Sequence, residues 1–135
     1  MLLEPGAPVT TSTSNRTVLV VDDQSSVLEV VAKILKHHSF QVLAASSPSD
    51  AIRIGAEYSG DIDLLLSDIT MAGMSGPDLA VNLAELRPQM RVMFMSGYAD
   101  GRLLLLDHGW HFIEKPFIPS ALVARVKRVL LEAPA

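Results

Sequence analysis

Four short runs of apolar residues, each ending abruptly at a polar side chain, constrain the fold of this chain more than any other feature of its sequence. Runs of this kind are typical of strands that are buried on both faces of a parallel sheet. Patterns with helical periodicity separate them, which predicts an α/β fold with a doubly wound, five-stranded parallel sheet in the order 2-1-3-4-5 and helices on both faces. The four runs are Val18–Val21, Leu64–Leu66, Val92–Met95 and Trp110–Ile113.

The expected strands and helices alternate from residue 17 to residue 131 in a flavodoxin-like arrangement. A helix is expected from Ser25 to His37, and Ser47-Pro48, Pro77 and Pro119 are expected to begin three more. The strands are expected at residues 17–21, 40–45, 62–67, 91–95 and 110–113. The side chains expected to face the core from the last two helices are Leu79, Leu83, Leu86, Leu122, Val126, Val129 and Leu130, with Arg125 and Arg128 outside.

Composition narrows the class of protein. A chain of 135 residues with 49% hydrophobic residues is long enough to bury a core of its own, and residues 17–132 are expected to form one domain after a flexible leader at residues 1–16. The absence of cysteine excludes disulfides and thiolate zinc sites. A net charge of -4 argues against direct contact with nucleic acid. No apolar run is long enough to span a membrane, so a cytoplasmic location without membrane contact is expected.

Polar side chains follow the four apolar runs at the point where each strand ends. Asp22-Asp23 follow the first run, Asp68 the second and Ser96-Gly97 the third, while Lys115 comes two residues after the fourth. Because the carboxyl ends of parallel strands meet at one edge of a sheet, where ligands bind in folds of this type, we expect these side chains to lie together. Each of them alone is more typical of a turn, but the conjunction predicts a site.

Three neighbouring carboxylates repel one another unless a cation shares the space. A site of oxygen ligands with few protein groups suits Mg²⁺, which keeps several of its waters. Asp23 and Asp68 are predicted to bind the ion directly, Asp22 through a water molecule, and Thr70 through its backbone carbonyl. The negative charges of the three acids are balanced by the divalent cation and Lys115 together, so the occupied site would be neutral and ready for an incoming dianion.

An aspartate carboxylate can attack phosphorus and form an acyl phosphate. Such a transfer needs positioning and charge neutralisation, which a metal ion and a lysine supply. Asp68, alone at the end of a central strand, is therefore the predicted nucleophile. Lys115 is predicted to pair with one phosphoryl oxygen and the Ser96 hydroxyl with another, while Gly97 leaves room for the group.

Other motifs have simpler interpretations. The spacing Gly73-x-x-Gly76 indicates turns rather than a phosphate loop. His37-His38 suits the end of a helix rather than a metal site, since no third ligand lies nearby in the sequence. Leu103–Leu106 shows no preferred face, and these leucines would mark a partner surface if they were exposed.

Over residues 17–131 the sequence resembles the receiver domain of two-component response regulators. The motifs that carry the resemblance are Val20-Val21-Asp22-Asp23, Asp68–Gly76, Met95-Ser96-Gly97-Tyr98 and Lys115-Pro116-Phe117. The resemblance implies that Asp68 accepts a phosphoryl group from the phosphohistidine of a histidine kinase or a histidine phosphotransfer domain, with Mg²⁺ as cofactor. It also implies a cis peptide at Lys115-Pro116 and a switch in which Ser96 moves toward the phosphoryl group while Phe112 turns inward. The alternative, which is weaker, is that Phe112 is simply a core residue.

Residues 95–100 look most like receivers fused to hybrid histidine kinases, so an excised hybrid-kinase receiver is expected, with a stand-alone regulator as the alternative. Three departures from the family stand out. Ala72 replaces a usual proline, which is expected to loosen the loop beside the site. Ile118 replaces a usual helix cap. Only 18 residues separate Ser96 from Lys115, which predicts a short or distorted fourth helix.

Two other functions would use some of the same residues. A phosphatase of the haloacid dehalogenase type also has a strand-end aspartate and magnesium, but it needs a second acid two residues later, where Thr70 stands. A pseudo-receiver would only bind a partner, and the presence of every charged site residue argues against it. No substrate turnover is expected beyond self-phosphorylation and autodephosphorylation.

Overall fold

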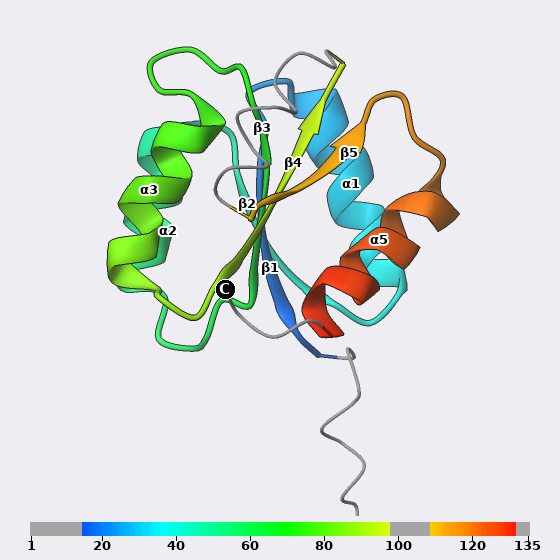
Figure 1. The fold of residues 1–135 in the computed structure, drawn as a ribbon, viewed down its shortest axis with the longest axis horizontal. Helices are drawn as coiled ribbons and strands as arrows, with labels where there is room; N and C mark the ends of the chain where they lie inside the picture. The colour runs from blue at the N-terminus through cyan, green and yellow to red at the C-terminus, as the bar shows by residue number, and fades with distance from the viewer. Residues whose placement is uncertain (1–14, 98–108, 132–135) are drawn as a thin grey trace, which may run out of the picture.

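The computed structural model describes residues 15–97 and 109–131, which form a layered α/β fold (Figure 1). A single sheet of five parallel strands has the order β2-β1-β3-β4-β5. This confirms the predicted fold class and strand order. The strands are β1 (Thr17–Val21), β2 (Gln41–Ala45), β3 (Leu64–Asp68), β4 (Arg91–Ser96) and β5 (His111–Glu114).

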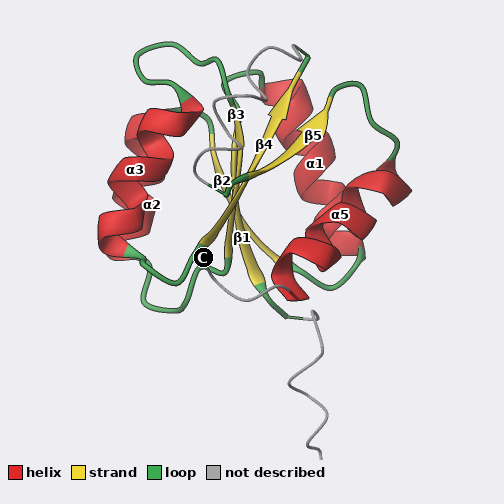
Figure 2. Cartoon of the chain, in the orientation of Figure 1, coloured by secondary structure: helices red, strands yellow, loops and turns green. Residues whose placement is uncertain are grey.

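Helices cover both faces of the sheet, as Figures 1 and 2 show. One face carries α1 (Ser25–His37) and α5 (Pro119–Leu131), and the other carries α2 (Pro48–Glu57) and α3 (Gly76–Leu86). Two hydrophobic clusters result, one on each face, because neighbouring residues of a strand point to opposite sides. The central strands β1 and β3 are almost completely buried, which explains their continuous apolar sequences.

Strand register brings the polar ends of four strands to one edge of the sheet. Val21, the last residue of β1, lies opposite Ser67. Asp68 lies opposite Met95, and Ser96 lies opposite Glu114 of β5. The residues that follow β1 and β5 therefore reach the same edge as the last residues of β3 and β4.

Serine hydroxyls determine where two helices begin. Ser47 accepts a hydrogen bond from the Asp50 N–H at the start of α2, as the sequence predicted. Ser75 accepts one from the Asp78 N–H at the start of α3, which therefore begins one residue before Pro77. In both helices a proline occupies the first turn, where its missing N–H costs no hydrogen bond.

Several details differ from the sequence-based predictions. Strand β3 begins two residues later than predicted and includes Asp68 as its last residue. Strand β2 begins one residue later than predicted, and β4 and β5 each end one residue later. Leu86, the last residue of α3, is 48% exposed, so it is not part of the core stripe. Arg125 is half-buried rather than outside, since its guanidinium donates a hydrogen bond of 2.5 Å to the Phe112 carbonyl oxygen.

Of the two glycines predicted to form turns after β3, Gly73 lies in the loop and Gly76 is the first residue of α3. Gly73 has φ of +91°, a conformation that side chains disfavour. Gly76 is required for a different reason, because a Cβ there would overlap the Asp68 carbonyl oxygen and lie 2.9 Å from Cε1 of Phe94. The loop is thereby packed directly against the backbone of the last residue of β3.

Several predictions fall outside the described residues: most of the leader, the Leu103–Leu106 segment and the fourth-helix region. Of the helices in the described part of the chain, none is both long enough and apolar enough to pass through a bilayer.

Candidate functional site

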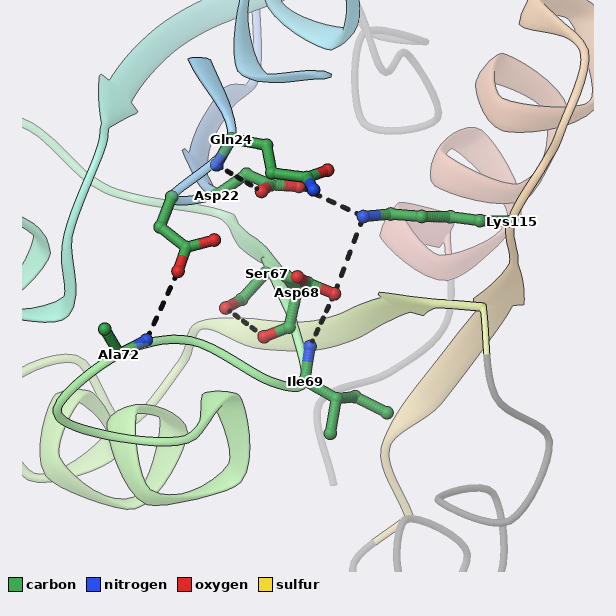
Figure 3. A network of polar contacts seen from close by, with 8 residues as sticks. Asp22, Gln24, Ser67, Asp68, Ile69, Ala72 and Lys115 are labelled. Atoms are coloured by element: carbon green, nitrogen blue, oxygen red, sulfur yellow. Dashed lines mark hydrogen bonds and ion pairs between the residues drawn. The ribbon is translucent and has the colours of Figure 1, made fainter. Parts of the chain in front are cut away.

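Three carboxylates from two strands meet at the carboxyl edge of the sheet. Asp22 and Asp23 follow β1, and Asp68 ends β3. One oxygen from each of the three lies within 4.8 Å of the others. The parallel register brings the acids that follow β1 close to the acid that ends β3, and Figure 3 shows Asp22 and Asp68 near Lys115.

Asp22 is completely buried, and nitrogen donors hold both of its carboxylate oxygens. Its Oδ1 accepts a hydrogen bond of 2.9 Å from the Gln24 N–H, which closes a turn at the end of β1. Its Oδ2 lies 3.2 Å from the Lys115 Nζ. Burial of this charge is tolerable because both oxygens are paired.

Lys115 lies between two of the acids, as Figure 3 shows. Besides its contact with Asp22, its Nζ lies 3.5 Å from Asp68 Oδ1. Its own N–H donates to the Ser96 carbonyl oxygen at 2.7 Å, which ties the end of β5 to the end of β4. The peptide bond from Lys115 to Pro116 is cis, as the resemblance implied.

The Asp68 carboxylate is fixed in rotation by two contacts on the same oxygen. Oδ1 accepts a hydrogen bond of 3.0 Å from the Ile69 N–H and also faces Lys115. Burial raises the pKa of this carboxyl above its ordinary value, the Lys115 ammonium opposes the rise, and the Asp22 carboxylate adds to it. A cation in the cluster would favour the ionised form.

In metal-free protein, the contribution of Asp68 to the free energy of unfolding is expected to fall as the pH rises. A raised pKa means that the folded chain binds this proton more tightly than the unfolded chain, so stability present at low pH is lost as the pH passes the folded-state pKa. Each unit by which the pKa in the folded chain exceeds that in the unfolded chain corresponds to about 1.4 kcal/mol of unfolding free energy. In urea denaturation with EDTA from about pH 4 to about pH 8, Asp68→Asn should become progressively more stable than the wild-type chain. A difference that does not vary with pH would contradict this.

Asp23 has a partner that the sequence did not indicate. The side chain is exposed, and its Oδ2 accepts a hydrogen bond of 3.2 Å from the Ala72 N–H in the loop after β3. Backbone amides carry no sequence signal of their own, so this contact could not have been found before the fold was known. The expectation that alanine at this position merely loosens the loop did not take this bond into account.

The remaining predicted residues lie in β4 and β5 or in the segments that follow β3 and β4. Ser96 is buried at the end of β4, and Gly97 beyond it is exposed, with no atom of the described part of the chain within 4 Å of where a Cβ would stand. Thr70 is exposed, two residues beyond Asp68. Phe112 on β5 is half-buried and packs against the hydrophobic cluster on the α2 and α3 side. The roles predicted for these four residues remain predictions.

The donor set fits a small, hard cation. All three clustered ligands are carboxylates, which suits Mg²⁺, and no histidine or cysteine of the described residues belongs to the group. Their excess negative charge is only partly balanced by one lysine. The same arrangement presents a carboxylate, an ammonium group and a cation site to one incoming anion, which is what phosphoryl transfer to an aspartate requires.

Comparison with known proteins points to one family. The family model of the response regulator receiver domain matches residues 18–127. The chain is 34% identical over 117 residues to the sensor kinase CckA of Brucella abortus, covering 84% of this chain and 12% of the kinase. A solved receiver domain from hybrid histidine kinase CckA has a TM-score of 0.74 at 34% identity, covering 86% of this chain and 99% of that one. Response regulator protein TrrA of Thermotoga maritima, solved with Mg²⁺-BeF, shares the fold with a TM-score of 0.74 at 24% identity. The match covers 84% of this chain and 98% of TrrA.

The chain spans between 12% and 52% of the length of the first three curated relatives that it matches. Receiver domains of this family bind Mg²⁺ at an acidic phosphorylation site and interact with histidine kinases or phosphotransfer domains. Since the family match extends over most of the chain, and the fold and the acidic edge agree with it, this chain belongs to the response regulator receiver domain family and has that family's phosphoacceptor role in two-component signalling.

Proposed function

We propose that Asp68 is the residue that accepts the phosphoryl group, from the phosphohistidine of a partner kinase or phosphotransfer domain. The observation that carries this proposal is the position of Lys115, whose Nζ lies between Asp22 and Asp68 at the acidic edge. Of the three acids, Asp68 ends a strand and has one oxygen fixed by the Ile69 N–H, which leaves the other oxygen for attack.

Magnesium would be held by Asp23 and Asp68 directly, by Asp22 through water, and by the Thr70 carbonyl. The full pairing of both Asp22 oxygens by Gln24 and Lys115 supports an indirect role for that residue. When bound, the ion would neutralise charge on the transferring group. The TrrA structure, which contains Mg²⁺-BeF, supports this assignment by its similar fold.

In the transfer, an Asp68 carboxylate oxygen attacks phosphorus while the bond from phosphorus to the donor histidine nitrogen breaks. The imidazole leaves with the electron pair of that bond and takes up a proton. The Lys115 ammonium then forms an ion pair with one phosphoryl oxygen, which replaces part of its interaction with the acids. The Ser96 hydroxyl donates a hydrogen bond to a second phosphoryl oxygen. Gly97 would leave space beside them, since no atom of the described residues lies within 4 Å of where its Cβ would stand.

Phosphorylation adds charge and acceptor oxygens that can bias a bistable element. We assign this element to Ser96 and Phe112, with Phe112 moving further into the cluster that it already touches. The change would alter the affinity of the domain for its output partner. We also propose that the domain is located in the cytoplasm and that it begins near residue 17.

The direct test is incubation of the full chain with magnesium and acetyl phosphate or phosphoramidate, followed by intact-mass measurement. We expect the mass of one phosphoryl group to be added, EDTA to prevent it, and hydroxylamine to remove it, because hydroxylamine cleaves acyl phosphates but leaves phosphate esters of serine or threonine. A hydroxylamine-resistant product, or no product, would contradict the proposal.

The donor domain must approach Asp68, and an apolar groove lies beside that approach. It has a volume of about 550 Å³ and shares Lys115 with the acidic site. Val30 of α1 lines it and is 57% exposed, and Phe117 lines the opposite side on the segment after β5. We assign this groove to the phosphohistidine-bearing domain.

Val30→Asp is expected to slow phosphotransfer about tenfold, because it places a charge in an apolar contact worth roughly 1.4 kcal/mol. The measurement uses a phosphorylated histidine kinase that transfers to the wild-type chain, with acetyl phosphate as the small donor. Val81→Asp on α3, where Val81 is 52% exposed on the opposite face, is the matched control. Equal slowing by both variants, or slowing with acetyl phosphate as well, would argue against docking at the groove.

A further inference from the structure

The loop between β3 and α3 contacts the acidic cluster through a backbone amide. The Ala72 N–H donates to Asp23 Oδ2 at 3.2 Å, across 49 residues of sequence. Both residues are exposed, so the bond adds little to the stability of the fold. Its position is more informative than its strength, because Asp23 is one of the three clustered acids and the same loop begins with Ile69 and Thr70.

Residue type decides whether this bond can exist. Proline has no N–H, so a chain with proline at this position could not donate to Asp23. Alanine has the donor, and the contact between the loop and the cluster depends on it.

We infer that Ala72 is a positioning residue for the divalent-cation site, an inference that rests on the proposed function. Its amide holds Asp23 Oδ2, which orients the carboxylate and leaves Oδ1 for the cation. It also ties the loop that contains Thr70 to the residue that follows Asp22. Hydrogen bonds that orient ligating carboxylates typically contribute 10- to 100-fold to metal affinity. Because this bond is exposed, we expect an effect of about tenfold.

The test compares Ala72→Pro, which removes the donor, with Ala72→Ser, which keeps it. Mg²⁺ binding to the metal-stripped full chain is measured by calorimetry. Binding should be about tenfold weaker in Ala72→Pro and unchanged in Ala72→Ser. Wild-type affinity in Ala72→Pro, or equal weakening in both variants, would overturn the inference.

A second measurement needs neither metal nor a folded proline variant. In EDTA, the Ala72 amide of the wild-type chain should exchange its hydrogen several-fold more slowly than in Asp23→Ala, while Asp23→Asn, which keeps an acceptor oxygen, should retain the protection. An amide equally unprotected in the wild-type chain and Asp23→Ala would overturn the inference while leaving Mg²⁺ binding and phosphoryl uptake intact. A wild-type chain that binds no Mg²⁺ would instead overturn the proposed function, and this inference with it.

Discussion

Asp68→Asn is expected to lower phosphoryl uptake from acetyl phosphate by at least about 100-fold, to the detection limit of intact-mass measurement. An amide oxygen lacks the charge and nucleophilicity of a carboxylate. Asp22 cannot easily replace Asp68, because nitrogen donors hold both of its oxygens.

The control is Asp61→Asn, which neutralises an exposed acid outside the cluster and should leave uptake unchanged. Circular dichroism of Asp68→Asn should show an intact fold, and its metal-free form should be more stable than the wild-type chain at neutral pH, in line with the raised pKa of Asp68. If Asp68→Asn takes up phosphate as well as the wild-type chain, Asp68 is not the nucleophile.

Gly76→Ala is expected to destabilise the fold by about 3 kcal/mol, which for a domain of this size lowers Tm by roughly 10 °C. The new Cβ would overlap the Asp68 carbonyl oxygen and approach Cε1 of Phe94 at 2.9 Å. Neither neighbour can move freely, because Phe94 is completely buried and the Gly76 N–H is bonded to the Ile69 carbonyl oxygen at 2.7 Å. Thermal denaturation with and without Mg²⁺ measures the effect.

Gly97→Ala is the matched control for this substitution. A Cβ at Gly97 meets no atom of residues 15–97 and 109–131 within 4 Å and its φ is not positive, so the change in stability should stay within about 0.5 kcal/mol. Equal stability of the Gly76→Ala and Gly97→Ala variants would show that the loop relaxes around the added methyl group. Because Gly76 packs on the Asp68 backbone, Gly76→Ala should also slow phosphoryl uptake, whereas a purely global loss of stability would leave uptake at low temperature unchanged.

The local pattern of the sequence was sufficient for the elements of the fold. Apolar runs and helical spacing predicted every strand and helix in the described part of the chain. The bounds of β3 differ by one or two residues from the prediction, and those of β2, β4, β5 and the start of α3 differ by one. These features depend on neighbouring residues, which is why they can be read without a structure. The prediction that Leu86 faces the core was wrong. Its exposure depends on tertiary structure, namely on where the last residue of α3 lies relative to the sheet, and not on its sequence neighbours.

For the site, the sequence by itself determined which side chains stand at the strand ends: Asp22, Asp23, Asp68, Ser96 and Lys115. Parallel strands place such residues at one edge, so their convergence followed from the fold class. Tertiary structure alone decided that the Lys115 ammonium lies between two acids 93 and 47 residues away, and that the Ala72 amide bonds to Asp23. The physical reason is that periodicity determines which way a side chain faces, whereas distances between remote groups depend on how all the layers pack together.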